Sequence, residues 1–228
     1  MLRLEPLQPC VPRRPQQLNV KSQPVVIVLA AGLGSRFLGP LHKLVQPLGS
    51  STVLGKTIAH AIESGLAVVV VTTERLAADA ARWVARRDVV VLPEVGSVGA
   101  GSLGMGHSIA AGVAARPQAG GWLVLPGDMP MVMPASLRAV AAGLAQHAVV
   151  YAQHLGRRGH PVGFSAELFS ELVQLDGDDG ARRVAARYPS VGLELVDPGV
   201  LVDVDTEADL ASMRAGVLPG VWPVGQVV

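Results

Sequence analysis

The sequence predicts an α/β fold, a three-layer sandwich in which helices cover both faces of a mostly parallel sheet. Short β-branched runs alternate along the chain with segments of helical spacing, which is the pattern of such sheets. Half of the 228 residues are apolar but only 4% are aromatic, so Ala, Val and Leu are expected to fill the core. A chain of this length buries enough surface to be stable without a disulfide or a structural metal.

Five apolar runs are the expected strands of this sheet. Each is short and dominated by β-branched or aliphatic residues, as are strands that helices cover on both faces. The runs are Val25–Leu29, Ala67–Val71, Val89–Leu92, Trp122–Leu125 and Val149–Ala152.

Two segments have clear helical spacing. In the first, apolar positions 54, 58, 61 and 62 share one face, after a cap at Ser51 or Thr52 and before a stop at Gly65. In the second, apolar positions 137, 140, 141 and 144 follow Pro134, a residue favoured in the first turn of a helix. Both segments are expected to pack on the sheet.

The chain is expected to form one domain, residues 25–216, between two tails. Residues 1–24 contain repeated prolines and are predicted to be a flexible N-terminal tail, and residues 217–228 form a C-terminal tail. The last third of the domain is less regular. The elements expected there are short strands at Pro161–Phe164 and Gly192–Val204 and a helix close to Ala181–Arg187.

Charge and composition exclude several classes of protein. Lys plus Arg number 19 and Asp plus Glu 18, a near balance that argues against a nucleic-acid-binding protein. No apolar run reaches the roughly 18 residues of a membrane span, and the first residues lack the apolar core of a signal peptide. The single cysteine, Cys10, excludes an intrachain disulfide and a zinc site with several cysteines. We therefore expect a cytoplasmic protein that binds neither nucleic acid nor membranes.

A glycine-containing turn follows the first predicted strand. Residues 29–37 read Leu-Ala-Ala-Gly-Leu-Gly-Ser-Arg-Phe, and Lys43 comes soon after. Small residues let successive backbone N–H groups approach phosphate oxygens, and Arg36 and Lys43 add positive charge. A dinucleotide-binding fingerprint would need a glycine where Phe37 stands. The pattern favours a site for a nucleoside triphosphate, with an ordinary strand-to-helix turn as the alternative.

A second glycine-containing sequence, Gly49–Thr57, resembles a P-loop but departs from it. Five residues separate its two glycines where a P-loop has four, and no strand leads directly into it. Its residues fit the face of a helix better than they fit a phosphate loop.

A carboxylate stands where open parallel sheets bind their ligands. Asp128 follows the predicted strand Trp122–Leu125 and therefore lies at the carboxyl edge of the sheet. Opposite a phosphate-binding turn, such a carboxylate is suited to Mg²⁺, which takes one or two protein carboxylates together with substrate phosphates. The alternative is that Asp128 only supports the turn before Pro130.

A second acidic pair, Asp203 and Asp205, lies near the end of the domain. Residues two apart on a strand share a face, so both carboxylates could point at one cation. Thr206 to Asp209 follow as a variant capping box. The alternative for Asp205 is that it only supports the start of that helix.

Taken in order, these motifs resemble the molybdenum cofactor cytidylyltransferase family of MobA-like nucleotidyltransferases, over residues 25–215. The motifs are residues 29–36 with Lys43, Gly104–Gly112, Pro126–Pro130, Gly159–Val162, Gly177–Arg182 and Asp203–Thr206. The resemblance implies a Rossmann-like (GT-A-like) nucleotidyltransferase fold. Within it, residues 25–150 would bind the nucleotide and residues 151–200 the acceptor.

The resemblance also implies an activity, the transfer of CMP from CTP to molybdenum-bound molybdopterin with Mg²⁺ as cofactor and release of pyrophosphate. Arg36, Lys43 and Asp128 would be catalytic, and Asp128 and Asp203 would hold the metal. The residues that would contact the nucleotide are Leu29, Ala30, Ala31, Gly32, Gly34, Arg36, Lys43, Gly106, Ser108 and Asp128, with Gly106 and Ser108 at the base. The residues that would contact the acceptor are His160, Asp178 and Arg182.

Two other functions fit the same motifs. One is a nucleotidyltransferase for another phosphorylated acceptor, such as a sugar phosphate, which would differ only within residues 150–190. The other is a non-catalytic nucleotide-binding chaperone that hands the cofactor to an apo-enzyme. Binding alone would not need both Lys43 and Asp128, which argues against the chaperone. A molybdoenzyme or its chaperone is the macromolecular partner that the resemblance suggests.

Overall fold

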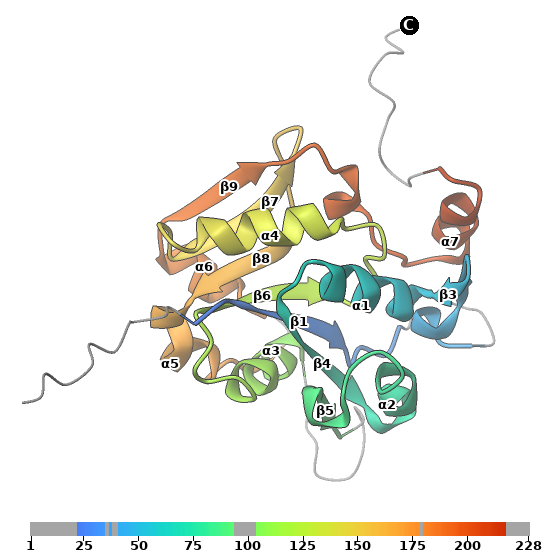
Figure 1. The fold of residues 1–228 in the computed structure, drawn as a ribbon, viewed down its shortest axis with the longest axis horizontal. Coiled ribbons are helices and arrows are strands. Elements are labelled where there is room, and N and C mark those ends of the chain that lie inside the picture. Colours follow the sequence, from blue (N-terminus) through green and yellow to red (C-terminus); the bar gives the residue numbers. More distant parts are fainter. Residues whose placement is uncertain (1–21, 35–36, 38–40, 94–103, 178–179, 218–228) are drawn as a thin grey trace, which may run out of the picture.

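The computed structural model describes residues 22–34, 37, 41–93, 104–177 and 180–217. Figure 1 shows a central sheet with helices on both faces, which confirms the predicted three-layer α/β architecture. The seven strands follow the order β5-β4-β1-β6-β8-β7-β9, and β8 runs antiparallel to both of its neighbours. The other pairings are parallel, so the sheet is mostly parallel, as predicted.

The five predicted strands are confirmed, the strand expected at Pro161–Phe164 lies within β8, and β9 completes the sheet. The strands of the main sheet are β1 Val25–Ala30, β4 Ala67–Thr73, β5 Val89–Leu92, β6 Gly121–Pro126, β7 Val149–His154, β8 Arg157–Ser165 and β9 Ser190–Glu194. A separate antiparallel pair is formed by β2 Pro47–Leu48 and β3 Ser51–Thr52.

Seven α-helices and four short 3₁₀ helices connect the strands of the described residues. The α-helices are α1 Val53–Glu63, α2 Glu74–Ala80, α3 Met105–Ala114, α4 Pro134–Gly143, α5 Phe169–Leu172, α6 Arg182–Arg187 and α7 Glu207–Arg214. The 3₁₀ helices are η1 Lys43–Val45, η2 Arg86–Asp88, η3 Ala166–Leu168 and η4 Pro198–Leu201.

Different helices cover the two faces of the sheet (Figure 1). Side chains of a strand alternate between faces, so Val26 and Val28 of β1 pack with α1 and α4, whereas Ile27 packs with α3, α5 and α6. Burying one such aliphatic side chain contributes about 1.5–3 kcal/mol. Two continuous cores, one on each face, therefore hold the carboxyl edge of the sheet in a fixed position.

The first helix, α1, begins and ends where the sequence predicts, but its buried face is narrower. The Oγ1 atom of Thr52 accepts a hydrogen bond from the Gly55 backbone at 3.0 Å, and Gly65 leaves the helix with a φ of +76°. Positions 54, 58 and 61 are buried, but Ile62 is 43% exposed. Ile62 lies at the edge of the apolar stripe, so its predicted place in the core is wrong.

As predicted, the segment Gly49–Thr57 does not form a phosphate-binding loop. Its second glycine, Gly55, lies inside α1, where an added Cβ would stand 2.7 Å from the ring of Trp83. This glycine therefore permits close packing between α1 and the segment that follows α2.

The predicted strands within Gly192–Val204 are only partly correct. β9 ends at Glu194, and the chain then turns through η4 because Asp197 accepts a hydrogen bond from the Gly199 backbone at 2.9 Å. The other carboxylate oxygen of Asp197 binds the backbone of Met133 at 2.9 Å and the hydroxyl of Ser136 at 2.6 Å. Asp203 and Asp205 therefore lie on a non-strand segment that is tied to the start of α4.

The predicted tails at 1–24 and 217–228 lie largely outside the described residues. None of the helices in the described ranges is both long enough and apolar enough to span a bilayer.

Candidate active site

The site lies where the carboxyl ends of β1 and β6 meet. These neighbouring parallel strands bring the first turn of the chain next to Gly127, whose backbone N–H donates to the Leu29 carbonyl at 2.8 Å. A Cβ at Gly127 would stand only 2.8 Å from that same oxygen. Only glycine therefore permits this close crossing, which places Asp128 beside the glycine turn, just past the end of β6 as predicted.

His42 holds the glycine turn against η1. The backbone N–H of Leu44 donates to His42 Nδ1 at 3.2 Å, so Nε2 carries the ring proton and donates to the Gly32 carbonyl at 3.0 Å. Burial lowers the pKa of His42, which keeps the ring neutral for these two bonds. Gly34 has a φ of +63°, and a Cβ there would stand 3.2 Å from Nε2. His42 thus ties Gly32 to the start of η1.

Lys43 projects from η1 into the carboxylates of the site. Its Nζ lies 2.6 Å from Asp128 Oδ2 and 2.9 Å from Asp205 Oδ1, and its side chain is only 11% exposed. Burial by itself would lower the pKa of Lys43, but the two carboxylates more than compensate and raise it. The ammonium group is therefore charged and fixed in place.

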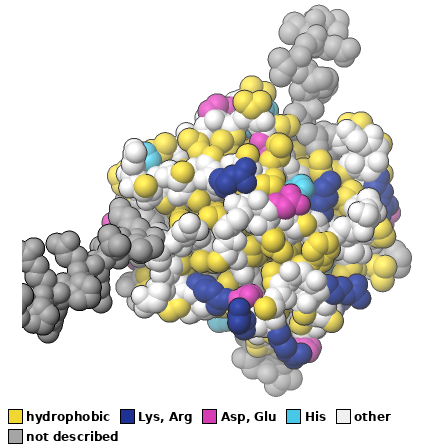
Figure 2. All heavy atoms as spheres, viewed as in Figure 1, with side chains coloured by type: hydrophobic (Ala, Val, Ile, Leu, Met, Phe, Trp, Pro, Cys, Tyr) yellow, Lys and Arg dark blue, Asp and Glu magenta, His cyan; other side chains and the backbone are white. Residues whose placement is uncertain are grey.

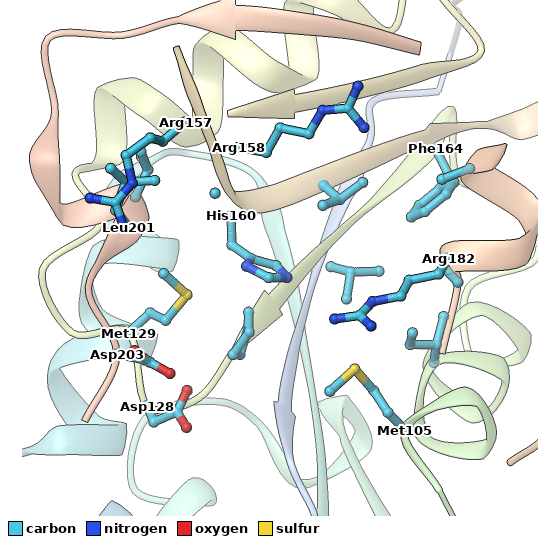
Figure 3. A pocket seen from close by; sticks show the side chains of 18 of the residues that line it. Met105, Asp128, Met129, Arg157, Arg158, His160, Phe164, Arg182, Leu201 and Asp203 are labelled. Carbon is cyan, nitrogen blue, oxygen red and sulfur yellow. The ribbon is translucent and has the colours of Figure 1, made fainter. Parts of the chain in front are cut away.

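A third carboxylate, Asp203, faces the same space. Asp128 and Asp203 point toward one another (Figure 3) and line one cavity with Asp205. Burial, and then the charges of Asp205 and Asp128, raise the pKa of Asp203 above its ordinary value. A bound cation would relieve this repulsion.

The charge and donor chemistry of this cluster fit a divalent cation. Asp128 Oδ1 is buried without a hydrogen-bond partner in the described structure, while Oδ2 is bound to Lys43. A buried carboxylate oxygen without a donor is costly unless it receives one or a cation. Among the described residues, no three His, Cys, Asp or Glu side chains form a ready metal cage. Two carboxylates completed by substrate phosphates are, however, the usual protein share of a Mg²⁺ site.

A cavity of about 570 Å³ opens beside these acids, between β6, β8, α3, α6 and η4 (Figure 3). Its wall is largely apolar, and its polar side chains apart from the acids are arginines and one histidine. The apolar residues include Ile109, Val124, Val162, Phe164, Val200 and Leu201, and the basic residues are Arg157, Arg158, His160 and Arg182. The cavity is therefore suited to a ligand with an apolar or flat body and anionic groups.

Two basic residues of the cavity have defined surroundings. The guanidinium of Arg158 lies 4.3 Å from the centre of the Tyr151 ring, a cation–π contact that orients it. Burial lowers the pKa of His160; the charge of Asp128 opposes this effect and that of Arg182 adds to it. His160 is therefore neutral and offers one donor and one acceptor to a ligand.

Only some of the remaining predicted site residues line the cavity. His160 and Arg182 line the cavity, whereas Arg36 and Asp178 lie outside the described residues. On α3, Met105 and Ile109 line the cavity, and the predicted base contacts Gly106 and Ser108 do not.

Gly106 has a structural task of its own. Its backbone N–H donates to the Gly177 carbonyl at 2.9 Å, and a Cβ there would collide with the Asp176 backbone. The glycine therefore lets the start of α3 pack tightly on the segment before α6. Ser108, on the same helix, is 7% exposed.

Sequence reasoning missed the main role of Asp205. The predicted capping box is confirmed, with Thr206 and Asp209 making reciprocal hydrogen bonds at the start of α7. Since the side chain of Asp209 fills that role, the Asp205 carboxylate is available to Lys43. Its spacing from Asp203 was the signal, because both side chains do face one cavity. The contact with Lys43, 162 residues away, has no sequence signal.

Comparisons with known proteins agree with this architecture. The model of the MobA-like NTP transferase domain family matches residues 26–191. The purine catabolism protein PucB of Bacillus subtilis is 30% identical, over 82% of this chain and 94% of its own length. The bifunctional protein GlmU of Xanthomonas campestris is 31% identical over 70% of this chain, which spans only 35% of GlmU.

Solved structures give the same result. Rv0371c of Mycobacterium tuberculosis is 30% identical and has a TM-score of 0.72, over 86% of this chain and all of that protein. A manganese complex of Rv0371c matches with a TM-score of 0.68 and 29% identity, over 85% of this chain and 98% of that one. The family match spans most of the chain and the fold agrees with it, so the protein belongs to the MobA-like NTP transferase family and is a nucleotidyltransferase.

Proposed function

We propose that the protein transfers CMP from CTP to molybdenum-bound molybdopterin and releases pyrophosphate. The observation that carries this proposal is the cavity itself, which is largely apolar, bears arginines and opens onto Asp128 and Asp203. An acceptor bound there would present its phosphate to the carboxylate cluster beside the glycine turn.

The cavity wall combines apolar and charged side chains, which suits an acceptor with a flat polar ring system and an anionic group. Aliphatic side chains and Phe164 would cover the faces of a pterin ring, and the basic and acidic side chains would bind its polar edge. In this proposal His160 and Arg182, together with Asp178, contact the acceptor, and the guanidinium of Arg182 binds an anionic group.

The nucleotide binds on the other side of Asp128 in this proposal. Backbone N–H groups of Ala31, Gly32 and Gly34 contact the triphosphate, Leu29 and Ala30 flank it at the end of β1, and Arg36 and Lys43 neutralise its charge. The rigid turn and the fixed Lys43 ammonium support this assignment. We assign the base to the start of α3. Because the Gly106 N–H is bonded to Gly177 and Ser108 is 7% exposed, these two residues would shape this region by packing and in that way favour a pyrimidine over the larger purine.

The proposed cofactor is Mg²⁺, held by Asp128 and Asp203. The unpartnered Oδ1 of Asp128 and the mutual repulsion of the acids support this site, and the relative Rv0371c has been solved in complex with manganese. When bound, the cation supplies charge neutralisation for the phosphates.

The protein residues act mainly by positioning and electrostatics. The acceptor phosphate is already ionised near neutral pH, so attack on the α-phosphorus needs no general base. The turn holds the triphosphate in line with the cavity, and Lys43 stabilises negative charge that grows on the phosphates during transfer. The apolar wall excludes water that would compete as the nucleophile.

A pyrophosphate-release assay with molybdenum-loaded molybdopterin and each of the four nucleoside triphosphates tests the proposal. We expect release with CTP and Mg²⁺, little with GTP, and none without the acceptor. If pyrophosphate were released only with a sugar phosphate as acceptor, the acceptor would be a sugar phosphate and not molybdopterin. CTP binding without release under any acceptor would favour a chaperone.

The metal assignment has a separate test. Asp203→Asn should raise the Mg²⁺ concentration needed for half-maximal rate about tenfold, since the cation loses one of two carboxylates. Glu207→Gln, an exposed acid four residues later, is the matched control. An unchanged Mg²⁺ requirement in Asp203→Asn would remove Asp203 from the metal site.

A further inference from the structure

We propose that Asp205 is a positioning residue, which holds the Lys43 ammonium at the phosphates while Asp128 is engaged by the metal. The inference rests on the proposed function in one respect, that Lys43 acts on the phosphates of the nucleotide. It assigns Asp203 and Asp205, two residues apart, to different tasks.

The Lys43 ammonium lies between carboxylates from two distant segments. Asp128, after β6, accepts from Nζ at 2.6 Å, and Asp205, before α7, accepts at 2.9 Å. The three side chains are between 11% and 18% exposed, so water screens these contacts only weakly. A long lysine side chain, which otherwise samples many rotamers, is thereby fixed at its tip.

The two carboxylate oxygens of Asp128 have different surroundings and can bind different partners. Oδ2 holds Lys43, whereas the buried Oδ1 has no hydrogen-bond partner in the described structure and is available to a cation. A cation on Oδ1 withdraws charge from the carboxylate and weakens its hold on Lys43. Asp205 supplies a second anion to the same ammonium, so Lys43 stays in place when the metal binds.

The backbone fixes Asp205 relative to Asp128. The N–H of Val204 donates to the Asp128 carbonyl at 2.9 Å, which joins the two acidic segments directly. The Asp209 carboxylate accepts from the backbone of Asp205 at 3.2 Å and of Thr206 at 2.8 Å. This capping box at the start of α7 therefore orients Asp205 without using its side chain.

The first test measures the contact itself and does not depend on turnover. The rate at which an amine-acylating reagent modifies Lys43 at pH 8 is followed by mass spectrometry, with Lys56 as an internal reference in the same sample. Loss of one carboxylate lowers the pKa of Lys43 and raises its reactive fraction, so Asp205→Ala should accelerate acylation of Lys43 about fivefold. Glu207→Ala should change neither lysine. An unchanged rate at Lys43 in Asp205→Ala would overturn the proposal.

The second test separates a positioning role from metal ligation and from a purely structural role. Asp205→Ala should lower kcat about tenfold with the Mg²⁺ requirement unchanged, and Asp205→Asn, which keeps an acceptor oxygen, should recover part of the loss. In a Lys43→Ala background, Asp205→Ala should have almost no further effect. Additive losses, or an Mg²⁺ requirement raised about tenfold, would show that Asp205 does not act through Lys43.

The two tests also separate failure of this inference from failure of the proposed function. If the wild-type protein released no pyrophosphate with any acceptor, the acylation rates would still decide whether Asp205 holds Lys43.

Discussion

The proposed nucleotide side and the proposed acceptor side of the site are built by different means. On the nucleotide side, His42 bonds the backbone of Gly32 and Leu44, and Lys43 bonds Asp128 and Asp205, at 2.6 to 3.2 Å. On the acceptor side, the cavity has a largely apolar wall, with arginines on β8 and α6. In the proposed function, the first side fixes the geometry of the phosphates, whereas the second selects the acceptor by shape and charge. Changes on the first side should therefore affect every acceptor, and changes on the second only the choice of acceptor.

Charged side chains on the face seen in Figure 2 are scattered among apolar and uncharged groups and do not gather into one large patch. The charge that matters is the local cluster of Asp128, Asp203, Asp205 and Lys43, and the overall charge of +1 says little about it.

The largest expected effect is on the nucleotide side. Lys43→Ala and Asp128→Ala should each lower kcat at least about a hundredfold with any acceptor. The first removes a positive charge beside the reacting phosphates, and the second removes a proposed ligand of the cation that neutralises them. Pyrophosphate release measures the effect, and far-UV circular dichroism checks that the variant folds. Near-normal turnover in a folded variant would remove that residue from the chemistry.

Alanine substitutions at two glycines should differ in their cost in unfolding free energy. Gly127→Ala pushes a Cβ toward the rigid Leu29 carbonyl and should cost about 2 kcal/mol of unfolding free energy. Gly163→Ala, on β8 beneath α4, meets side-chain methyl groups of Val140 and Leu144 at 3.0 and 3.3 Å and no rigid backbone, so it should cost about 1 kcal/mol.

Urea denaturation measures both values. Gly127→Ala should also lower turnover, since it displaces Asp128. Equal costs at the two glycines would contradict the prediction that the Leu29 carbonyl is more rigid than the side chains next to Gly163.

A smaller effect is expected from the acceptor side. Arg182→Ala should raise the KM for the acceptor about tenfold and leave the KM for CTP unchanged, since the lost contact is a charge-assisted hydrogen bond to the acceptor. Arg183→Ala is the matched control, because Arg183 is the next residue on α6 and does not line this cavity. A rise only in the KM for CTP would contradict the assignment of Arg182 to the acceptor.

The smallest expected effect is on the pH dependence of stability. His160 faces Asp128 and Arg182, and its pKa is lowered mainly by burial, so the folded protein binds the proton less tightly than the unfolded chain. Its contribution to stability is therefore present above the ordinary histidine pKa and is lost as the pH falls below it. Melting curves between pH 7.5 and pH 5.5 should show a smaller decrease in Tm for His160→Gln than for the wild type. An unchanged decrease would show that His160 does not contribute to it.

The sequence predicted the nucleotide side better than the acceptor side, for a physical reason. Gly32, Gly34 and Asp128 occupy turns that immediately follow strands, and strand periodicity together with the parallel-sheet rule places such turns at one edge. Hence Val25–Ala30 and Gly121–Pro126, and the residues after them, could be located from local sequence alone.

The acceptor side depends on long-range packing. Its wall combines residues from α3, β6, β8, α6 and η4, and no local pattern indicates that Ile109, Phe164 and Leu201 face one cavity. The contact between Lys43 and Asp205 is of the same kind. Gly192–Val204 was predicted as strand from its apolar residues, but the Asp197 hydrogen bonds decide its path, and their Met133 and Ser136 partners lie about sixty residues earlier.

A crystal structure of the protein with CTP and Mg²⁺ tests the central claim most directly. The account predicts a metal ion about 2.0–2.1 Å from an oxygen of Asp128 and one of Asp203. It also predicts the triphosphate on the backbone of residues 29–34, with Lys43 still bound to Asp205. A metal bound elsewhere, or a nucleotide seated in the cavity of Arg182 and Phe164, would contradict it.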